Sequence, residues 1–382
     1  MSRGGSDTYD AVVIGAGPAG GIAALGLARA GHHVLLVDKQ RFPRPKVCGC
    51  CLNAPALATL RDAGLSEAVA ALRPRRVNGL VMRAGARVVR LPLPAGAALS
   101  RPALDGMIVD AAAVAGAVFR DGVSARVVPG GDAEAWRRVV LNTETIRTRC
   151  VVVADGLAGT ALRGWPDWAS AARPDARVGL GVHLPADHVL AEVLRDQAVT
   201  MLCGRRGYLG LVRLEHGGID LAAAADRDAL KTCGGAAALA RSIAADVGVR
   251  FDDAHAWPWR VTPPLTRTRR RLATRGLFVV GDAAGYVEPF TGEGMAWALA
   301  GGVAVVPHAA AAIDDARAAD PAAWTTTHRR VVARRQRRCR AVAALLRRPR
   351  LTRLAVGVLA VTPGLAAPLV PRAARRRAGV AA

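Results

Sequence analysis

A glycine-rich turn near the start of the chain constrains the fold more than any other feature. The turn reads Gly15-Ala16-Gly17-Pro18-Ala19-Gly20 and directly follows the short apolar run Tyr9–Ile14. Helix-forming residues occupy Ile22–Ala30, and a second apolar run, His33–Val37, ends at Asp38. This order of strand, turn, helix and strand within about thirty residues predicts a βαβ unit with parallel, buried strands.

The glycine spacing in this unit is typical of a dinucleotide site. Gly15 and Gly17 allow a tight turn and let a pyrophosphate approach the backbone, while Gly20 lets helix and strand pack closely. The N-terminus of the helix offers unpaired N–H groups to the phosphates. Asp38 follows about twenty residues later, where an acid can accept hydrogen bonds from a ribose. The site residues predicted from this unit are Gly15, Gly17, Pro18, Ala19, Gly20, Asp38 and Lys39.

Composition limits the remaining classes. With 382 residues, 52% of them hydrophobic, the chain can bury a substantial core and is not disordered. The seven cysteines are odd in number and unevenly spaced, which favours a reducing compartment. The group Cys48-Gly49-Cys50-Cys51 has no second Cys or His group at matching spacing, so we expect no metal site. The histidines form no hydrolase arrangement along the sequence.

Further elements follow from periodicity. We expect helices at 53–63 and 104–115, an antiparallel strand pair within 78–93, and a long apolar helix opening at Gly294. Buried strands are expected at 150–154 and 277–280, and further strands at 178–184, 208–214 and 219–223. Gly217-Gly218 is expected to form the turn of a hairpin.

A second glycine-rich segment suggests which dinucleotide is bound. Gly281-Asp282-Ala283-Ala284-Gly285 follows the buried run 277–280, and Glu288-Pro289-Phe290-Thr291-Gly292-Glu293-Gly294 leads into the long helix. These segments resemble the FAD-dependent oxidoreductase superfamily of aromatic-ring hydroxylases, flavin-dependent halogenases and, most closely, geranylgeranyl reductases. The resemblance implies that Asp282 binds the ribityl chain and that the Gly292-Glu293-Gly294 turn lies beside the isoalloxazine ring. It implies the FAD-binding residues Gly281, Asp282, Pro289, Gly292, Glu293, Gly294 and Met295. Glu293 is also a first-turn acid that stabilises the helix, the role we favour over catalysis.

Three more segments carry the resemblance. Arg41–Gly49 looks like the segment after the ribose-binding acid, Ser100–Asp105 like the family's arginine segment, and Ala154-Asp155-Gly156 like its DG motif. The resemblance implies that Cys48, Gly49, Arg101 and Asp155 lie near the cofactor. The residues after Gly156 depart from the family pattern of a Ser and an Arg, so we expect no pyridine-nucleotide role for them.

The resemblance implies an α/β fold with a Rossmann-type FAD-binding domain built on a parallel sheet. A substrate domain with a mixed or antiparallel sheet is inserted into it, and a helical tail follows. The expected ranges are 8–77, 100–160 and 263–324 for the FAD-binding domain, 78–99 and 161–262 for the substrate-side domain, and 325–382 for the C-terminal appendage.

The expected activity is FAD-dependent reduction of a carbon–carbon double bond in a lipophilic substrate, as in geranylgeranyl reductases. One alternative is a monooxygenase that hydroxylates an aromatic lipid or polyketide, and another is a membrane-surface binding protein with structural FAD. Halogenation is not expected, because the segment Trp257-Pro258-Trp259 does not match the halogenase motif. Since the chain has one dinucleotide fingerprint, NAD(P)H would be only a transient reductant, and the electron donor stays unidentified. Candidate catalytic residues are Cys48, Glu288 and Tyr208.

The C-terminal segment is strongly basic. The net charge of +23 attracts phosphate or an anionic membrane surface, and arginines of 328–353 flank a proline-interrupted apolar stretch at 354–370. We expect this tail to lie on an anionic membrane, as a peripheral protein on the cytoplasmic face of the inner membrane, with no signal peptide or spanning helix. A solvated basic helix packed on the FAD-binding domain is a second interpretation. Nucleic-acid binding ranks last, because aromatic residues make up 4% of the chain.

Overall fold

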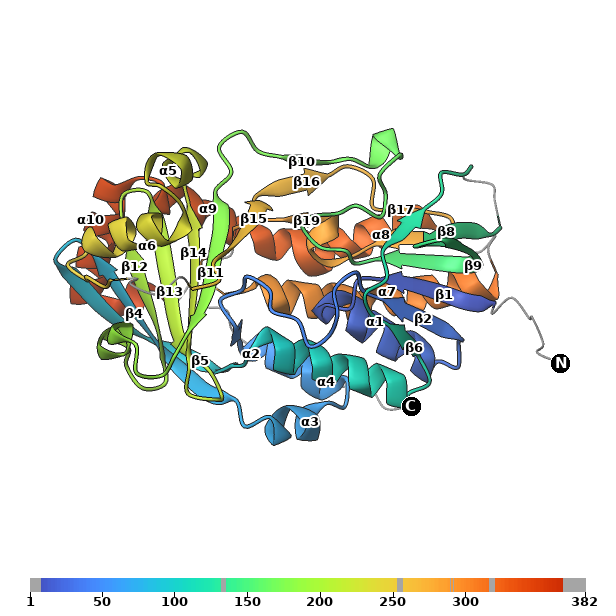
Figure 1. Cartoon of the computed structure of the whole chain (residues 1–382), viewed down its shortest axis with the longest axis horizontal. Coiled ribbons are helices and arrows are strands. Elements are labelled where there is room, and N and C mark those ends of the chain that lie inside the picture. Colours follow the sequence, from blue (N-terminus) through green and yellow to red (C-terminus); the bar gives the residue numbers. More distant parts are fainter. Residues whose placement is uncertain are drawn as a thin grey trace.

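The computed structural model describes residues 8–131, 135–252, 257–288, 290, 292–315 and 320–366. Two eight-stranded sheets lie side by side along the long axis of the molecule, each with its own helices (Figure 1). A small third sheet of β10 (Ser170–Ala172), β16 (Arg267–Arg269) and β19 (Gly285–Tyr286) lies between them.

The first sheet has a parallel core of five strands. β1 (Tyr9–Ile14) lies at its centre, pairing with β2 (Val34–Val37) on one side and β9 (Glu144–Val153) on the other. The remaining strands are β6 (Val118–Arg120), β18 (Leu277–Val279), β17 (Ala273–Thr274), β7 (Ala125–Val127) and β8 (Arg137–Leu141). Parallel strands buried on both faces read as continuous apolar runs, which is why the sequence located β1, β2, β9 and β18.

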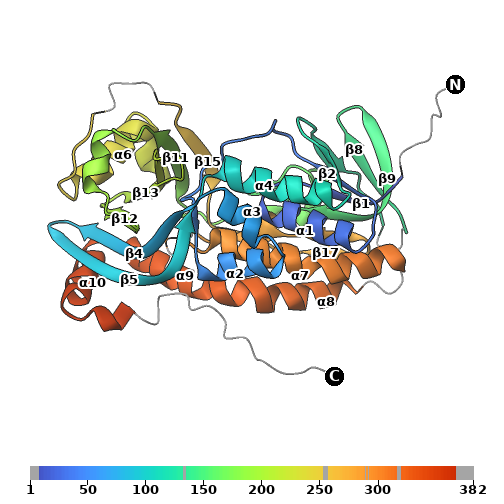
Figure 2. The same cartoon turned by 90° about the horizontal axis from the view of Figure 1, so that it is seen from below.

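Three helices form one layer on this sheet. α1 (Pro18–Arg29) packs between α4 (Arg101–Val114) and α7 (Gly294–Asp314), as Figure 2 shows from below. α2 (Ala54–Asp62) contacts α7, and α3 (Ser66–Ala71) contacts α4. The βαβ unit and the helices expected at 53–63 and 104–115 are confirmed, with α4 beginning three residues earlier than expected because Ser100 caps its N-terminus.

The second sheet is mixed. Its order is β15 (Arg260–Pro264), β11 (Val178–Leu184), β14 (Ile219–Ala225), β13 (Gly207–Arg213), β12 (Ala198–Cys203), β4 (Arg75–Ala84), β5 (Arg87–Ala98) and β3 (Cys51–Leu52). The expected β4–β5 pair and the β13–β14 hairpin are confirmed. The sequence missed β12, which runs parallel to β4, and the helices α5 (Arg227–Thr232) and α6 (Ala236–Ala245). The predicted domain ranges stay a prediction.

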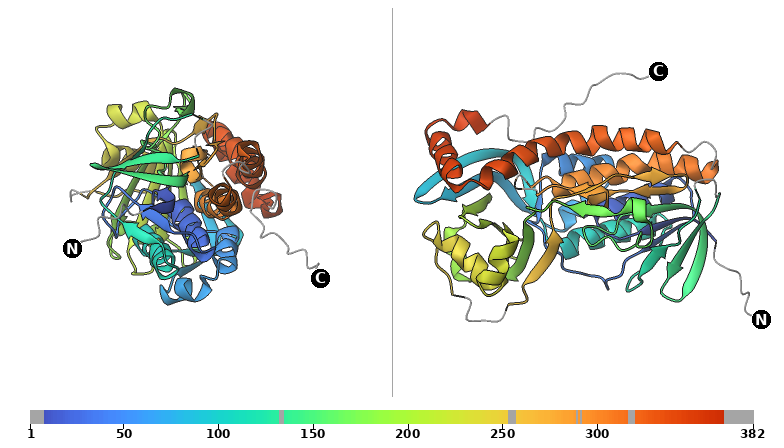
Figure 3. Two further views of the ribbon diagram at one scale, coloured as in Figure 1. Left: turned by 90° about the vertical axis from the view of Figure 1, so that its right-hand side faces the viewer. Right: turned by 90° about the horizontal axis from the view of Figure 1, so that it is seen from above.

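The C-terminal helices bridge the two sheets. α8 (Pro321–His328) continues through 329–333 into α9 (Arg334–Leu346), and this long run lies along α7 before α10 (Pro349–Val361) turns over β4 and β5 (Figure 3). The second interpretation of the basic segment, a helix packed on the first domain, is seen for α8 and residues 329–333, which contact α7. Among the described residues, α7 is long and apolar enough to cross a membrane, but it packs against α1, α2 and β9 as a core helix.

Candidate functional site

The glycine turn places the N-terminus of α1 at the carboxyl end of the parallel sheet. Gly15 has a φ of 104°, a conformation that favours glycine. A side chain on Gly20 would overlap the carbonyl oxygen of Gly15, so this glycine is required for the helix to start where it does. Gly17 occupies the N-cap position, and α1 begins at Pro18 with its first N–H groups free of side-chain caps.

Asp38, which directly follows β2, holds this turn in place through hydrogen bonds. Its carboxylate accepts hydrogen bonds from the backbone N–H groups of Ala16 and Gln40, each at 2.9 Å. It also pairs with the Arg44 guanidinium at 3.2 Å. Asp38 is buried and holds both the turn and an arginine in place, a role that leaves lone pairs for a ribose hydroxyl.

Two guanidinium groups face the turn. Arg101 pairs with Asp105 at 2.7 Å, and Arg44 pairs with the same carboxylate at 3.3 Å. A Cβ atom on Gly17 would lie 3.5 Å from Arg44 Nη2 and 3.6 Å from Arg101 Nη2. A helix N-terminus, an absent side chain and two fixed guanidinium groups together form an anion site, which fits the pyrophosphate of FAD.

A cavity of about 330 Å³ extends from this anion site into the second half of the molecule. Most of the residues that the sequence implicated line it, whereas the predicted glycines Gly15 and Gly20 do not. The predicted residues that line the cavity are Gly17, Pro18, Ala19, Cys48, Gly49, Arg101, Tyr208, Gly281, Asp282, Gly292, Gly294 and Met295. Pro289 lies outside the described residues.

Other predicted cofactor residues lie outside the cavity lining, and their predicted role stays a prediction. Lys39 is exposed, and Asp155 accepts a hydrogen bond from the backbone N–H of Ala161 at 2.8 Å. Glu293 is the N-cap residue of α7, and its carboxylate accepts a hydrogen bond from the Cys339 thiol of α9 at 2.9 Å. The side chains of Lys39, Asp155 and Glu293, like that of Asp38, do not line the cavity. The hydrogen bond between Cys339 and Glu293 connects α9 with α7.

Sequence reasoning missed two polar residues at the cofactor end of the cavity, Lys46 and Tyr286. The Lys46 ammonium lies 3.7 Å from the Asp282 carboxylate. Burial lowers the pKa of Lys46, an effect that the negative charge of Asp282 opposes. The sequence could have indicated Lys46, because the chain contains very few lysines and this one lies within Arg41–Gly49, a segment that carries the family resemblance.

Cys48 faces the cavity from the same loop as Lys46. A hydrogen bond from Cys50 lowers the pKa of the Cys48 thiol to about 6; burial opposes this shift, and the positive charge of Arg101 assists it. The Cys48 side chain is therefore in an environment that stabilises a thiolate.

The structure separates the other two catalytic candidates. Glu288 is fully buried between Arg177 and Arg347, 3.3 Å from each, and it does not line the cavity. Burial raises the pKa of Glu288, while the two arginines oppose the shift. Glu288 is thus part of an ion-pair network that holds α9 to the second sheet. Tyr208 does line the cavity and packs edge-on against Phe290, with ring centroids 4.9 Å apart.

The far half of the cavity is apolar and has a floor of small residues. Ala222 on β14 pairs with Gly210 on β13, and both line the cavity, while Gly181, the partner of Ala222 on β11, leaves room for the cavity-lining Val47. Apolar side chains of β4, β5, β12, α9 and α10 form the walls. These are Leu80, Met82, Leu91, Val199, Met201, Val342, Leu345, Leu346, Val356 and Leu359. The shape and chemistry suit an apolar ligand.

Comparisons with known proteins agree with this geometry. The profile of a family described as FAD binding domain matches residues 8–338. Menaquinone reductase of Mycobacterium tuberculosis is 29% identical over 328 residues, which cover 77% of this chain and 74% of that protein. Digeranylgeranylglycerophospholipid reductase 2 of Methanothermobacter thermautotrophicus is 28% identical over 316 residues, covering 75% of this chain and 74% of the relative.

Solved structures show the same fold. The flavin-dependent brominase Bmp2 superimposes with a TM-score of 0.75 at 18% identity, covering 95% of this chain and 92% of the brominase. The flavoprotein/dehydrogenase from Cytophaga hutchinsonii gives a TM-score of 0.67 at 19% identity and covers 78% of each chain. At these identities the likeness concerns the fold alone.

A single methyl group added at Gly17 tests the anion site. Gly17→Ala should leave the fold intact, because the new Cβ has room beside both arginines, but it should obstruct the approach of the pyrophosphate to the backbone. We expect FAD affinity to fall by about 10- to 100-fold, the cost of about 1–3 kcal/mol for lost polar contacts. Titration of the apoprotein with FAD, followed by flavin fluorescence, measures the change.

Gly106→Ala is the matched control, because nothing lies within 4 Å of a Cβ atom at that position in α4. This variant should bind FAD like the parent. Unchanged FAD affinity in Gly17→Ala would show that the cofactor does not approach the turn.

Proposed function

The chain belongs to the FAD binding domain family and is an FAD-dependent oxidoreductase, and we propose that it reduces a carbon–carbon double bond in an isoprenoid lipid. The observation that carries this proposal is the single cavity that joins the FAD-binding turn to an apolar chamber. A long apolar chain in the chamber would place its double bond next to the cofactor without exposing either to water.

Polar residues line the cavity at the cofactor end and beyond it. When bound, reduced FAD supplies the hydride, and a proton must reach the other carbon of the double bond. Tyr286 and Tyr208 both line the cavity, and burial raises the pKa of each well above its usual range. Both tyrosines therefore keep their protons at neutral pH, and Tyr286 can donate its proton to the substrate, whereas the Tyr208 hydroxyl is hydrogen-bonded to the Glu288 carboxylate. Lys46 and Arg101 supply positive charge at the same end, which favours a reduced, anionic cofactor.

The relatives support this choice of substrate class. The names of the two reductases described above refer to menaquinone and to a digeranylgeranyl lipid, both of which carry isoprenoid chains. Each aligns with about three quarters of the present chain. The small-residue floor and the apolar walls fit the same class, because an isoprenoid chain offers no hydrogen bonds and needs only space and apolar contact.

Filling the floor tests the proposed substrate chamber. Ala222→Phe places a ring in the cavity beside Gly210, and we expect it to reduce lipid turnover by at least about tenfold, because the ring would occupy space that the lipid chain needs. The measurement is anaerobic reduction of a geranylgeranyl lipid by the chemically reduced protein, with the product detected by mass spectrometry.

The same position provides a graded control. Ala222→Val adds less volume and should give a smaller loss, while FAD content and melting temperature should stay near parental values in both variants. Parental turnover in Ala222→Phe with full FAD content would place the substrate elsewhere.

We further propose that the outer face of α10 contacts an anionic membrane. One face of this helix lines the cavity with Ala355, Val356 and Leu359. The opposite face exposes Leu351, Leu354, Val358 and Val361, and the nearby arginines Arg348, Arg350 and Arg353 are exposed as well. An amphipathic surface of this kind can lie among lipid headgroups. A lipid could then pass from the bilayer to the cavity around a single helix.

Negative charge introduced on this face tests the membrane contact. The double variant Leu354→Asp/Val358→Asp should lose at least about tenfold in binding to vesicles that contain phosphatidylglycerol, because burial of each side chain contributes about 1.5–3 kcal/mol. Cosedimentation measures the binding. Val114→Asp/Val189→Asp alters exposed valines on other elements and should bind like the parent. Equal binding by both double variants would contradict the proposal.

A further inference from the structure

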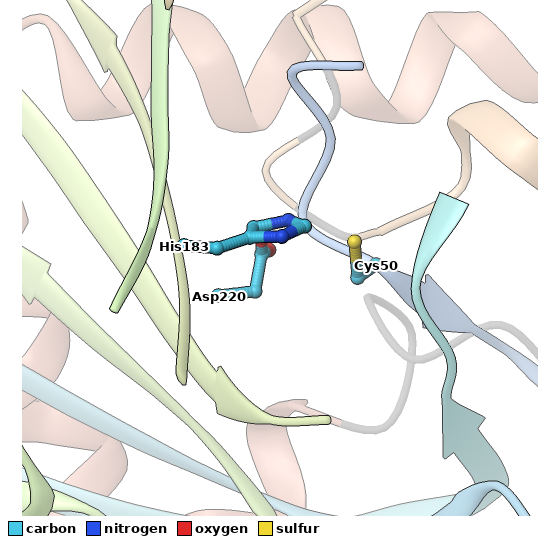
Figure 4. A group of neighbouring side chains, drawn as sticks. All are labelled: Cys50, His183 and Asp220. Carbon is cyan, nitrogen blue, oxygen red and sulfur yellow. The ribbon is translucent and has the colours of Figure 1, made fainter. Parts of the chain in front are cut away.

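Three side chains with different donor atoms converge beside the cavity. Cys50 comes from the loop before β3, His183 from β11 and Asp220 from β14 (Figure 4). The Cys50 sulfur, a ring nitrogen of His183 and a carboxylate oxygen of Asp220 all lie within 4.8 Å of one another. His183 and Asp220 are directly opposite in the pairing of β11 with β14, and His183 Nε2 lies 3.1 Å from Asp220 Oδ1.

The pairing of His183 with Asp220 leaves part of the carboxylate unsatisfied. Asp220 is 2% exposed, and within the described part of the chain its Oδ2 atom has no hydrogen-bond partner of good geometry. A buried carboxylate oxygen in that state is costly, and such atoms in native proteins usually face a bound water or ion. This oxygen belongs to the same cluster as the fully buried Cys50 thiol.

The backbone of Cys50 supports a specific role for its side chain. Cys50 has a φ of 49°, a left-handed conformation that costs a non-glycine residue about 1–2 kcal/mol. Its carbonyl accepts a hydrogen bond from Leu99 N at 2.9 Å, which fixes the loop against the end of β5. Glycine would hold this turn at lower cost, so the thiol is what the residue contributes.

We propose that Cys50, His183 and Asp220 bind a Zn²⁺ ion. Thiolate, imidazole and carboxylate are the donors that Zn²⁺ accepts together, whereas Mg²⁺ and Ca²⁺ require oxygen donors. Zinc bonds of about 2.0–2.3 Å place tetrahedral ligands within about 4 Å of one another, so the three side chains need only small rotamer adjustments. Three protein ligands leave the fourth position for water.

The bound ion would connect two parts of the cavity wall. The loop that carries Cys50 also carries Lys46 and Cys48, while His183 and Asp220 belong to the second sheet. An ion between them would fix the loop against the sheet. The sequence predicted no metal site because these donors come from three distant segments and only strand pairing brings them together. The proposal does not depend on the identity of the lipid substrate.

Metal analysis of the purified, FAD-loaded protein tests the proposal. After dialysis against Zn²⁺ and removal of loosely bound ions, we expect about one zinc per chain by plasma mass spectrometry. X-ray absorption should show one sulfur at about 2.3 Å and lighter donors at about 2.0–2.2 Å. Cys50→Ala, His183→Asn and Asp220→Asn should each lower zinc affinity by at least about tenfold, measured by competition with a chromophoric chelator.

Cys233→Ala and His308→Ala are matched controls, since neither residue belongs to the cluster. Both should retain the zinc. FAD content and melting temperature identify any variant that fails to fold, and the partly exposed His183 makes His183→Asn the variant least exposed to that risk. The proposal is overturned if the parent takes up far less than one zinc per chain, if absorption shows no sulfur ligand, or if a folded His183→Asn variant binds zinc like the parent.

Discussion

The contact between Gly20 and the carbonyl of Gly15 is the constraint on which the rest of the structure depends. With no side chain at Gly20, the first turn of α1 can press against the glycine turn and begin at the end of the parallel sheet. That position directs the free N–H groups of the helix toward the anion site. Arg44 and Arg101 then converge on the same place, held there by Asp38 and Asp105.

The second sheet and the C-terminal helices add an apolar part to the cavity that begins at this anion site. The mixed sheet contributes a floor of glycine and alanine, and α9 and α10 cover it with apolar side chains. The buried Arg177–Glu288–Arg347 network fixes α9 to the sheet, so the cover is anchored by ion pairs as well as by apolar contact. The C-terminal helices thus serve both the cavity and, on the outer face of α10, the proposed membrane contact.

Much of the first domain could be predicted from the sequence, because its strands are buried on both faces and its glycine turn is local. The β4–β5 and β13–β14 pairs were equally accessible, since each is closed by a short turn. The sequence did not predict the parallel pairing of β12 with β4 or the return of α10 over these strands. Both depend on contacts between segments far apart in the chain.

The candidate site divides in the same way. Gly17, Arg101 and Asp282, which line the cavity, were predicted from local motifs, whereas the position of the candidate Glu288 between two arginines depends on distant elements. The cluster of Cys50, His183 and Asp220 was invisible for the same reason. Local pattern therefore located the cofactor end of the cavity, while long-range packing determined its apolar end.

An anaerobic experiment tests the proposed hydride transfer to a lipid double bond. The reduced protein is mixed with a geranylgeranyl lipid in the absence of oxygen, while flavin absorbance and the mass of the lipid are followed together. We expect the flavin to be reoxidised as the lipid gains two hydrogen atoms. A flavin that stays reduced until oxygen is admitted, with a product that gains an oxygen atom, would contradict it.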